Sequence, residues 1–141
     1  MTISRTDGTH GLIVTGTGIV TIQDFNQTAE QIYPVDSSLG ECWYQLIDFM
    51  QVEALHLDSQ GVRHLSALNS RAFKINPYFL IAIAGRKDLI FGMSRMWQAF
   101  LEKDYWETKV FRDSEKAKSW LKNGVRNKFN QEITFEETPP A

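Results

Sequence analysis

The sequence contains a single cysteine, Cys42, which excludes an internal disulfide framework and a zinc site built from cysteines. The three histidines, His10, His56 and His64, are too scattered to predict a metal site. No apolar stretch approaches the ~20 residues of a membrane-spanning helix, since the longest runs only from Tyr78 to Ala84. The first residues hold charges and no apolar run, so no secretory signal is expected. We therefore expect a cytoplasmic protein with no membrane span, no metal and no cofactor.

Basic residues are scarce in the first half of the chain. Residues 1–70 hold two of them against eight acidic residues, whereas residues 71–141 hold 13 against nine, and the net charge is −2. This mildly acidic balance does not favour a nucleic-acid binder. Elements from the two halves of an α/β fold interleave in space. We therefore expect the asymmetry to bring acidic and basic groups together within one chain, or between the two chains of a homodimer.

What the sequence does contain fits one folded domain. A length of 141 residues is ordinary for a single domain. A hydrophobic fraction of 43%, with four Trp, four Tyr and nine Phe residues, argues against disorder. No internal repeat or low-complexity segment occurs.

Two β-branched runs open the patterned part of the chain, at residues 12–15 and 19–22, with Gly16-Thr17-Gly18 between them. A short loop with two glycines between such runs predicts a β-hairpin. Alternatively, Thr21 and Asp24 could form a capping box for a helix that starts at residue 22. We favour the hairpin, because β-branched residues make a poor first helical turn. Asn26 would then cap a short helix over about residues 27–33.

The rest of the chain alternates strands with helices. The predicted strands cover residues 43–50, 78–84 and 107–112, and the predicted helices run from Asp58 to about 73, from about 88 to 101, and from Asp113 or Ser114 to Asn123-Gly124. Residues 51–57 are expected to form a connection. This alternation predicts an α/β domain with a mixed, mostly parallel sheet of about five strands and about four helices. Its ligand-accessible end should be the carboxyl end of the parallel strands.

A strand that ends in an aspartate, YQLIDF at residues 44–49, is followed by an Asp-Ser-x-Gly helix start at residues 58–61. This stretch resembles the centre of STAS domains, a family of anti-sigma-factor antagonists and of cytoplasmic domains of sulphate transporters, although the connection here is about two residues longer. Further segments resemble the anti-sigma-antagonist-like group, which shares its fold with the CRAL-TRIO lipid-exchange domains: residues 80–86, 91–96 and 110–121.

The resemblance implies one STAS-like domain over residues 10–122. Residues 1–9 form an N-terminal extension that is polar and therefore expected to be frayed, and residues 123–141 form a C-terminal tail. It also implies a non-catalytic regulatory or protein-interaction module. In signalling members of the family, a partner kinase phosphorylates the second serine of Asp-Ser-Ser-Gly. Gln60 stands at that position here and has no hydroxyl. We therefore expect the usual phosphorylation switch to be absent, with Ser59 matching only the first serine.

The helix start at Asp58, Ser59, Gln60 and Gly61 is the first candidate binding site. Backbone N–H groups point outward from such a start and can hold a phosphate or carboxylate, or meet a partner. Plain N-capping by Asp58 is the competing interpretation, and its carboxylate would itself repel an anion.

Three further charged residues are candidates for binding a partner or ligand. Arg86 follows the strand that ends at Ala84, at the same predicted end of the sheet, and could meet an acidic group. Asp48 lies near the end of its strand, and Arg95 lies on the next predicted helix. Structural pairing or solvation is the competing interpretation for each of them.

A stripe of apolar residues marks the helix predicted over residues 88–101: Met93, Met96, Trp97 and Phe100. Such a stripe is mostly core, but it leaves room for an apolar pocket or a dimer face. The alternative function is therefore a small apolar-ligand or lipid-binding domain. We do not expect an enzyme, because no convergent acid, base and nucleophile can be named.

Overall fold

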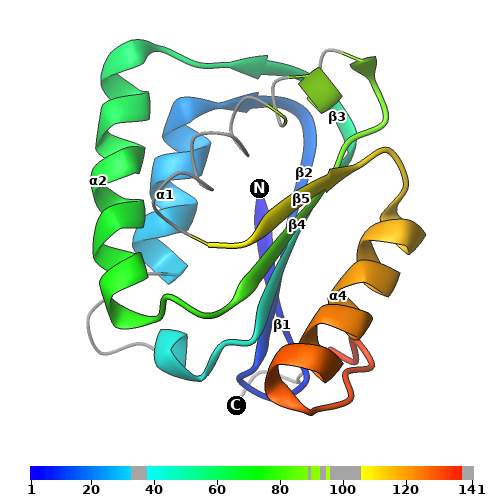
Figure 1. The fold of residues 1–141 in the computed structure, drawn as a ribbon. Coiled ribbons are helices and arrows are strands. Elements are labelled where there is room, and N and C mark those ends of the chain that lie inside the picture. The colour runs from blue at the N-terminus through cyan, green and yellow to red at the C-terminus, as the bar shows by residue number, and fades with distance from the viewer. Residues whose placement is uncertain (33–37, 89, 93–94, 96–105, 138–141) are drawn as a thin grey trace.

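The computed structural model describes residues 1–32, 38–88, 90–92, 95 and 106–137, and shows one sheet between two helical layers (Figure 1). The strands lie side by side in the order β1-β2-β3-β4-β5. The strands are β1 (Thr2–Thr6), β2 (Gly11–Thr21), β3 (Tyr44–His56), β4 (Leu80–Ala84) and β5 (Thr108–Phe111), and the helices are α1 (Ile22–Ile32), the 3-10 turn η1 (Ser38–Glu41), α2 (Ser59–Ile75) and α4 (Ser114–Phe129).

The sheet is mixed and mostly parallel, as the sequence predicted. Among the described strands only β1 runs antiparallel to its neighbour, and β2 to β5 pair in parallel. Helices α1 and α2 cover one face and α4 covers the other (Figure 1). None of the helices in the described part of the chain is both long and apolar enough to cross a membrane.

The expected hairpin at residues 12–22 is wrong. Residues 11–21 form one strand, β2, with irregular register on either side of Thr17 and with Gly18 at φ +63°. A glycine accommodates this left-handed backbone and bends the strand without turning it back. The hairpin instead joins β1 to β2 through Asp7 and Gly8, both at positive φ. Residues 2–6, expected to be frayed, are therefore paired as β1.

The capping box of Thr21 and Asp24, the less favoured alternative, is the arrangement that forms. Asp24 accepts hydrogen bonds from the backbone N–H and the hydroxyl of Thr21, and the Asp24 N–H donates to the Thr21 hydroxyl at 3.2 Å. Helix α1 therefore begins at Ile22, directly after β2. Asn26 lies inside this helix, so its expected role as N-cap is wrong.

Strand β3 is longer than the sequence indicated, because residues 51–56, expected to be a connection, continue the strand. Its first part, residues 44–48, pairs with both β2 and β4. Its last part pairs only with β2, as far as Thr21 opposite His56. We call these paired segments, residues 17–21 and 51–56, the β2–β3 extension. The starts of α1 and α2 lie at the end of this extension, beyond the rest of the sheet.

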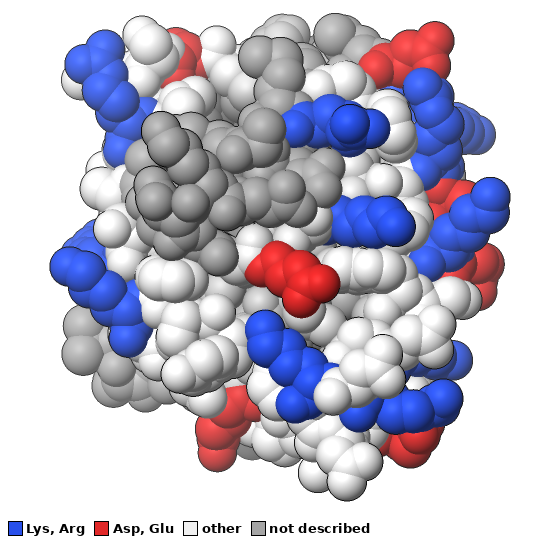
Figure 2. All heavy atoms as spheres, viewed as in Figure 1, with Lys and Arg blue, Asp and Glu red and all other residues white. Residues whose placement is uncertain are grey.

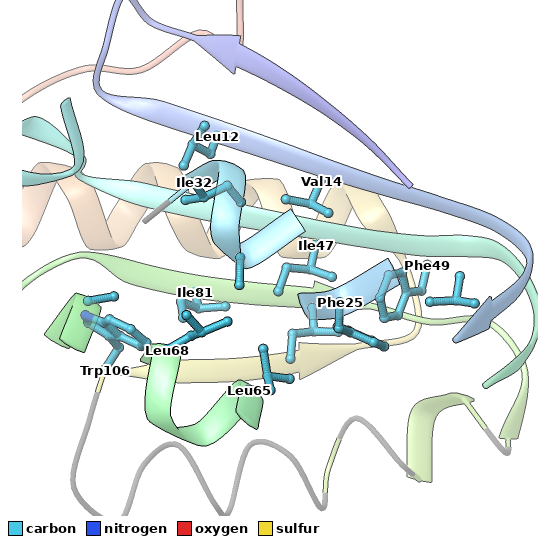
Figure 3. Packing of buried hydrophobic residues seen from close by; sticks show 14 of the residues in the cluster. Leu12, Val14, Phe25, Ile32, Ile47, Phe49, Leu65, Leu68, Ile81 and Trp106 are labelled. Atoms are coloured by element: carbon cyan, nitrogen blue, oxygen red, sulfur yellow. The ribbon is translucent and has the colours of Figure 1, made fainter. Parts of the chain in front are cut away.

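Two hydrophobic clusters hold the layers together. Between the sheet and helices α1 and α2 lie the residues labelled in Figure 3: Leu12, Val14, Phe25, Ile32, Ile47, Phe49, Leu65, Leu68, Ile81 and Trp106. Trp106 stacks on Phe79 with 4.6 Å between ring centroids, and its indole N–H donates to the Asn76 carbonyl at 2.6 Å. On the other face the core is smaller and comprises Tyr44, Leu46, Leu80, Ala82, Ala84, Ala117, Leu121, Val125 and Ile133.

Helix α4 does not end at Asn123-Gly124 as expected. It continues to Phe129 and ends where Asn130 adopts the left-handed conformation at φ 55°. Gly124 is a packing position, since a Cβ there would lie 2.5 Å from Leu80 Cδ1. The glycine therefore brings α4 close to β4 instead of ending the helix.

The helix predicted over residues 88–101 falls largely outside the described residues. Asp88, residues 90–92 and Arg95 are helical, and Ile90 is fully buried. Met93, Met96, Trp97 and Phe100, which make up the predicted stripe, lie outside the described residues. Their role as core, pocket or dimer face stays a prediction.

Candidate functional site

The start of α2 is built by residues of the Asp-Ser-x-Gly segment. Asp58 is the N-cap, and its carboxylate accepts a hydrogen bond from the Gly61 N–H at 2.7 Å. The capping interpretation of Asp58 is thus confirmed. Gly61 is needed for packing, because a Cβ there would lie 2.4 Å from Ile22 Cγ1 at the start of α1. Its carbonyl also accepts a bond of 3.4 Å from the Asn26 side chain, so the two helix starts are held together.

The side chains around this helix start are turned to solvent. Residues 56–60 are all exposed. Among them Leu57 has 42% of its surface exposed, and Val62 in the first turn of α2 has 38%. Ile19 on the paired strand β2 is 59% exposed. These three are among only five large hydrophobic side chains that are exposed in the described part of the chain.

Arg86 lies in the loop after β4, and its neighbour Lys87 ties this loop to the β2–β3 extension. The Lys87 ammonium pairs with the carboxylate of Glu53 on β3. This hydrogen bond and the charge of Lys87, with a smaller contribution from Arg86, hold the pKa of Glu53 below its ordinary value. Arg86 itself is exposed and has no ion-pair partner among the described residues. The loop and the extension therefore lie together, as the common strand end predicted.

Asp48 does not join this group. It is half-buried in the middle of β3, level with Ala84, and its carboxylate accepts a bond of 3.0 Å from the Met50 N–H. Ten residues of extended chain, roughly 30 Å, separate it from Asp58. Asp48 therefore has a structural role. Its carboxylate binds the backbone at the point where β3 stops pairing with β4.

Arg95 is exposed on the helical segment after β4, and no ion pair or hydrogen bond joins it to another described residue. A neighbouring ion pair was not foreseen. Arg112, after β5, donates to Asp88 at 2.6 Å and lies 4.2 Å from the centroid of the Phe91 ring. No sequence spacing links Arg112 to Asp88, so only the sheet order could have revealed this pair.

Two histidines and the cysteine, residue types that often carry catalysis, have structural surroundings here. His10 contacts the Glu41 carbonyl and His64 contacts the Glu30 carboxylate. Burial raises the pKa of the Cys42 thiol to about 12, which keeps it protonated and unreactive. No three or more His, Cys, Asp or Glu residues gather as a metal site in the ranges that the structure describes.

A small cavity lies between α1, α2 and the sheet. Its volume is about 40 Å³, and it is lined mostly by apolar residues together with the buried side chains of Thr28, Gln45 and Asn69. The Gln45 Nε2 has no hydrogen-bond partner among the residues that the structure describes. Because one water needs roughly 10–15 Å³, the cavity has room for a few waters and not for a lipid. It does not support the alternative function of carrying an apolar ligand.

Known proteins share the fold of the chain. It is similar to the crystal structure of an uncharacterised protein of the DUF3478 family from Shewanella loihica PV-4, which has a SpoIIAA-like fold. The TM-score is 0.53 and the identity 21%, over 85% of this chain and 90% of that one. The SpoIIAA-like fold is the STAS, or anti-sigma-antagonist, fold, so the chain has the predicted STAS-like fold. No protein-family model matches the chain, and no curated protein does.

Proposed function

We propose that the chain is a non-catalytic regulatory or protein-interaction module of STAS type that binds its partner through the start of α2. The observation that carries the proposal is the exposure of this helix start at the end of the β2–β3 extension. Ser59 and Gln60 are exposed there beside the apolar side chains of Leu57 and Val62. Apolar contacts surrounded by polar groups are the usual composition of a protein interface.

Arg86 supplies the charged part of this proposed surface. The pair between Lys87 and Glu53 fixes the loop against the extension, which leaves the Arg86 guanidinium available for an acidic group of the partner. Asp48 and Arg95 stay predicted contact residues, with Asp48 the weaker of the two because its carboxylate already binds the Met50 N–H. A cytoplasmic location and a homodimer likewise stay predictions.

Binding would not be controlled by the phosphorylation usual in the family. Gln60 offers a carboxamide that both donates and accepts hydrogen bonds, but it has no hydroxyl to receive a phosphoryl group. The surface would therefore be ready to bind at all times. Ser59, at the first position of α2, remains beside Gln60 as a small polar contact.

A photo-crosslinking amino acid at Gln60 tests the proposal in cells that express the chain. Helix α4 offers a matched control, because Asp113 caps it as Asp58 caps α2 and Glu115 occupies the position of Gln60. We expect the probe at Gln60 to capture a defined protein that the probe at Glu115 does not. Capture of the same protein at both positions, or of none at Gln60, would contradict the proposed surface.

The captured protein then allows a quantitative comparison. Ser59→Asp should weaken its binding about tenfold, as expected when a charge is placed in an interface. Ser114→Asp, the same change at the same position of α4, should leave the affinity within about twofold. An equal effect of the two substitutions would show that the partner binds elsewhere.

A further inference from the structure

A groove runs along the edge of the sheet on the side of α4. This helix packs on β3, β4 and β5. The groove beside it has a volume of about 440 Å³. It is lined by Glu107, Trp120, Asn123, Gly124, Asn127 and Lys128.

The groove lies between Glu107, which directly precedes β5, and one face of α4. Side chains two residues apart on β5 share a face, which places Lys109 and Phe111 beside α4. The Lys109 ammonium lies 5.6 Å from the Phe111 ring centroid, and the Phe111 ring lies 5.9 Å from that of Trp120. On α4, Asn123 and Asn127 follow Trp120 at helical spacing, so the indole and two carboxamides form one stripe.

Lys128 and Glu107 line the groove itself, and two further lysines, Lys109 and Lys116, lie on the neighbouring β5 and α4. Lys116, Lys128 and Lys109 are exposed, and none forms an ion pair with a described residue. Residues 106–129 hold seven basic and three acidic residues, although the whole chain is acidic. On the face shown in Figure 2, Lys and Arg gather over β5 and α4, at the right, with fewer Asp and Glu among them.

The groove has the length and the hydrogen-bonding groups for an extended peptide. Lys116 and Lys128 are twelve residues apart on α4, or about 18 Å, which is the length of about five residues of extended chain. Each Asn carboxamide offers two N–H donors and one carbonyl acceptor, which match the groups of a peptide backbone. The Glu107 carboxylate can accept a backbone N–H of a bound peptide, and it repels carboxylates and phosphates alike.

We propose that the groove between β5 and α4 binds an extended acidic segment of a partner protein. Trp120 packs against the segment, Asn123 and Asn127 bind its backbone, and Lys109, Lys116 and Lys128 pair with its carboxylates. This surface is separate from the start of α2, and its existence does not depend on the function proposed above.

Fluorescence anisotropy with a labelled peptide of alternating Glu and Val residues tests the proposal on the full chain. Asn123→Asp combined with Asn127→Asp keeps the shape of the groove and adds two negative charges, and it should weaken binding about tenfold. Gln23→Glu combined with Gln27→Glu adds the same charges to exposed positions of α1 and should change binding less than about threefold. Circular dichroism verifies that both variants fold.

Two further probes exclude other occupants. A peptide with Lys in place of Glu should not bind, and single-stranded oligouridylate should neither bind more tightly than the acidic peptide nor displace it. The proposal is overturned if the acidic peptide shows no saturable binding below about 1 mM, or if both paired variants weaken it equally. It is also overturned if the oligonucleotide displaces the acidic peptide, or if sedimentation shows that a second copy of the chain fills the groove.

Discussion

The Tyr44 hydroxyl donates a hydrogen bond of 2.6 Å to the carboxylate of Asp7, and so joins the first turn of the chain to its central strand. The same carboxylate accepts bonds from the N–H and hydroxyl of Thr134 and from the Phe135 N–H. The Phe135 ring packs edge-on against Tyr44 at 5.2 Å. One side chain near the N-terminus therefore fastens the C-terminal tail to the sheet.

Asp7→Asn should lower the free energy of unfolding by about 2 kcal/mol, the usual contribution of hydrogen bonds to a charged group. Asparagine tolerates the left-handed backbone at φ 50°, so the effect isolates the side chain. The amide N–H groups cannot accept the hydrogen bonds that Oδ2 accepts. Urea unfolding measures the difference. Asp24→Asn, at the start of α1, is a control that should leave the tail intact in limited proteolysis.

The stability that Asp7 provides should disappear in acid. Burial alone would raise the pKa of Asp7, but the hydrogen bonds from Tyr44, Thr134 and Phe135 outweigh it and hold the pKa below the ordinary 3.8. A carboxylate whose pKa is lowered in the folded state stabilises the protein at pH values above its unfolded-state pKa. This stabilisation is lost as the pH falls through the folded-state pKa. The difference in free energy of unfolding between wild type and Asp7→Asn should stay constant from pH 7 to about 5 and shrink below about 4. A free-energy difference of unchanged size at pH 3 would contradict the stabilising role of the Asp7 carboxylate.

The sequence predicted the fold better than the details of its strands. Buried runs such as residues 80–84 and caps such as Asp58 depend on local patterns, so their prediction was correct. The bend of β2 at Gly18 could not be told from a turn, because a glycine between β-branched runs serves either structure. The length of β3 was underestimated, since polar residues in 51–56 are tolerated where the strand pairs on only one side.

The candidate site was predicted in part for a similar reason. Residues that follow strand ends, such as Ser59 and Arg86, were placed at one end of the sheet by topology alone. Asp48 was misplaced because the end of β3 was misjudged. The pair of Lys87 with Glu53 and the groove beside Trp120 depend on long-range packing, for which the sequence carries no local signal.

Gly61→Ala should destabilise the protein although alanine favours helices. The gain in helix propensity is about 1 kcal/mol, but the new methyl group would lie 2.4 Å from Ile22 Cγ1. Overpacking of this kind costs about 1–3 kcal/mol, so we expect a net loss of roughly 1 kcal/mol in thermal or urea unfolding. Adding Ile22→Val to Gly61→Ala should restore part of the lost stability. Gly40→Ala, where a Cβ would have no described atom within 4 Å, should be neutral.

The two buried amides Gln45 and Asn76 should respond in opposite ways to apolar substitution. Asn76 donates to the carbonyls of Leu39 and Cys42 at 2.8 and 2.9 Å, whereas the Gln45 Nε2 has no hydrogen-bond partner in the described part of the chain. An unpaired buried N–H costs about 1–3 kcal/mol, so Gln45→Met, of similar length and shape, should raise the free energy of unfolding by about 1 kcal/mol. Asn76→Leu should lower it by roughly 3 kcal/mol, because two buried carbonyls lose their donor.

Urea unfolding of both variants at pH 7 measures the contrast. A loss of stability in Gln45→Met would mean that the Gln45 amide is bound in solution, by water in the 40 Å³ cavity beside it. Thr28→Val distinguishes the two cases, because it removes a hydroxyl that lines the same cavity. In a hydrated cavity both substitutions are destabilising and their effects are coupled, whereas in a dry one Gln45→Met remains stabilising in either background.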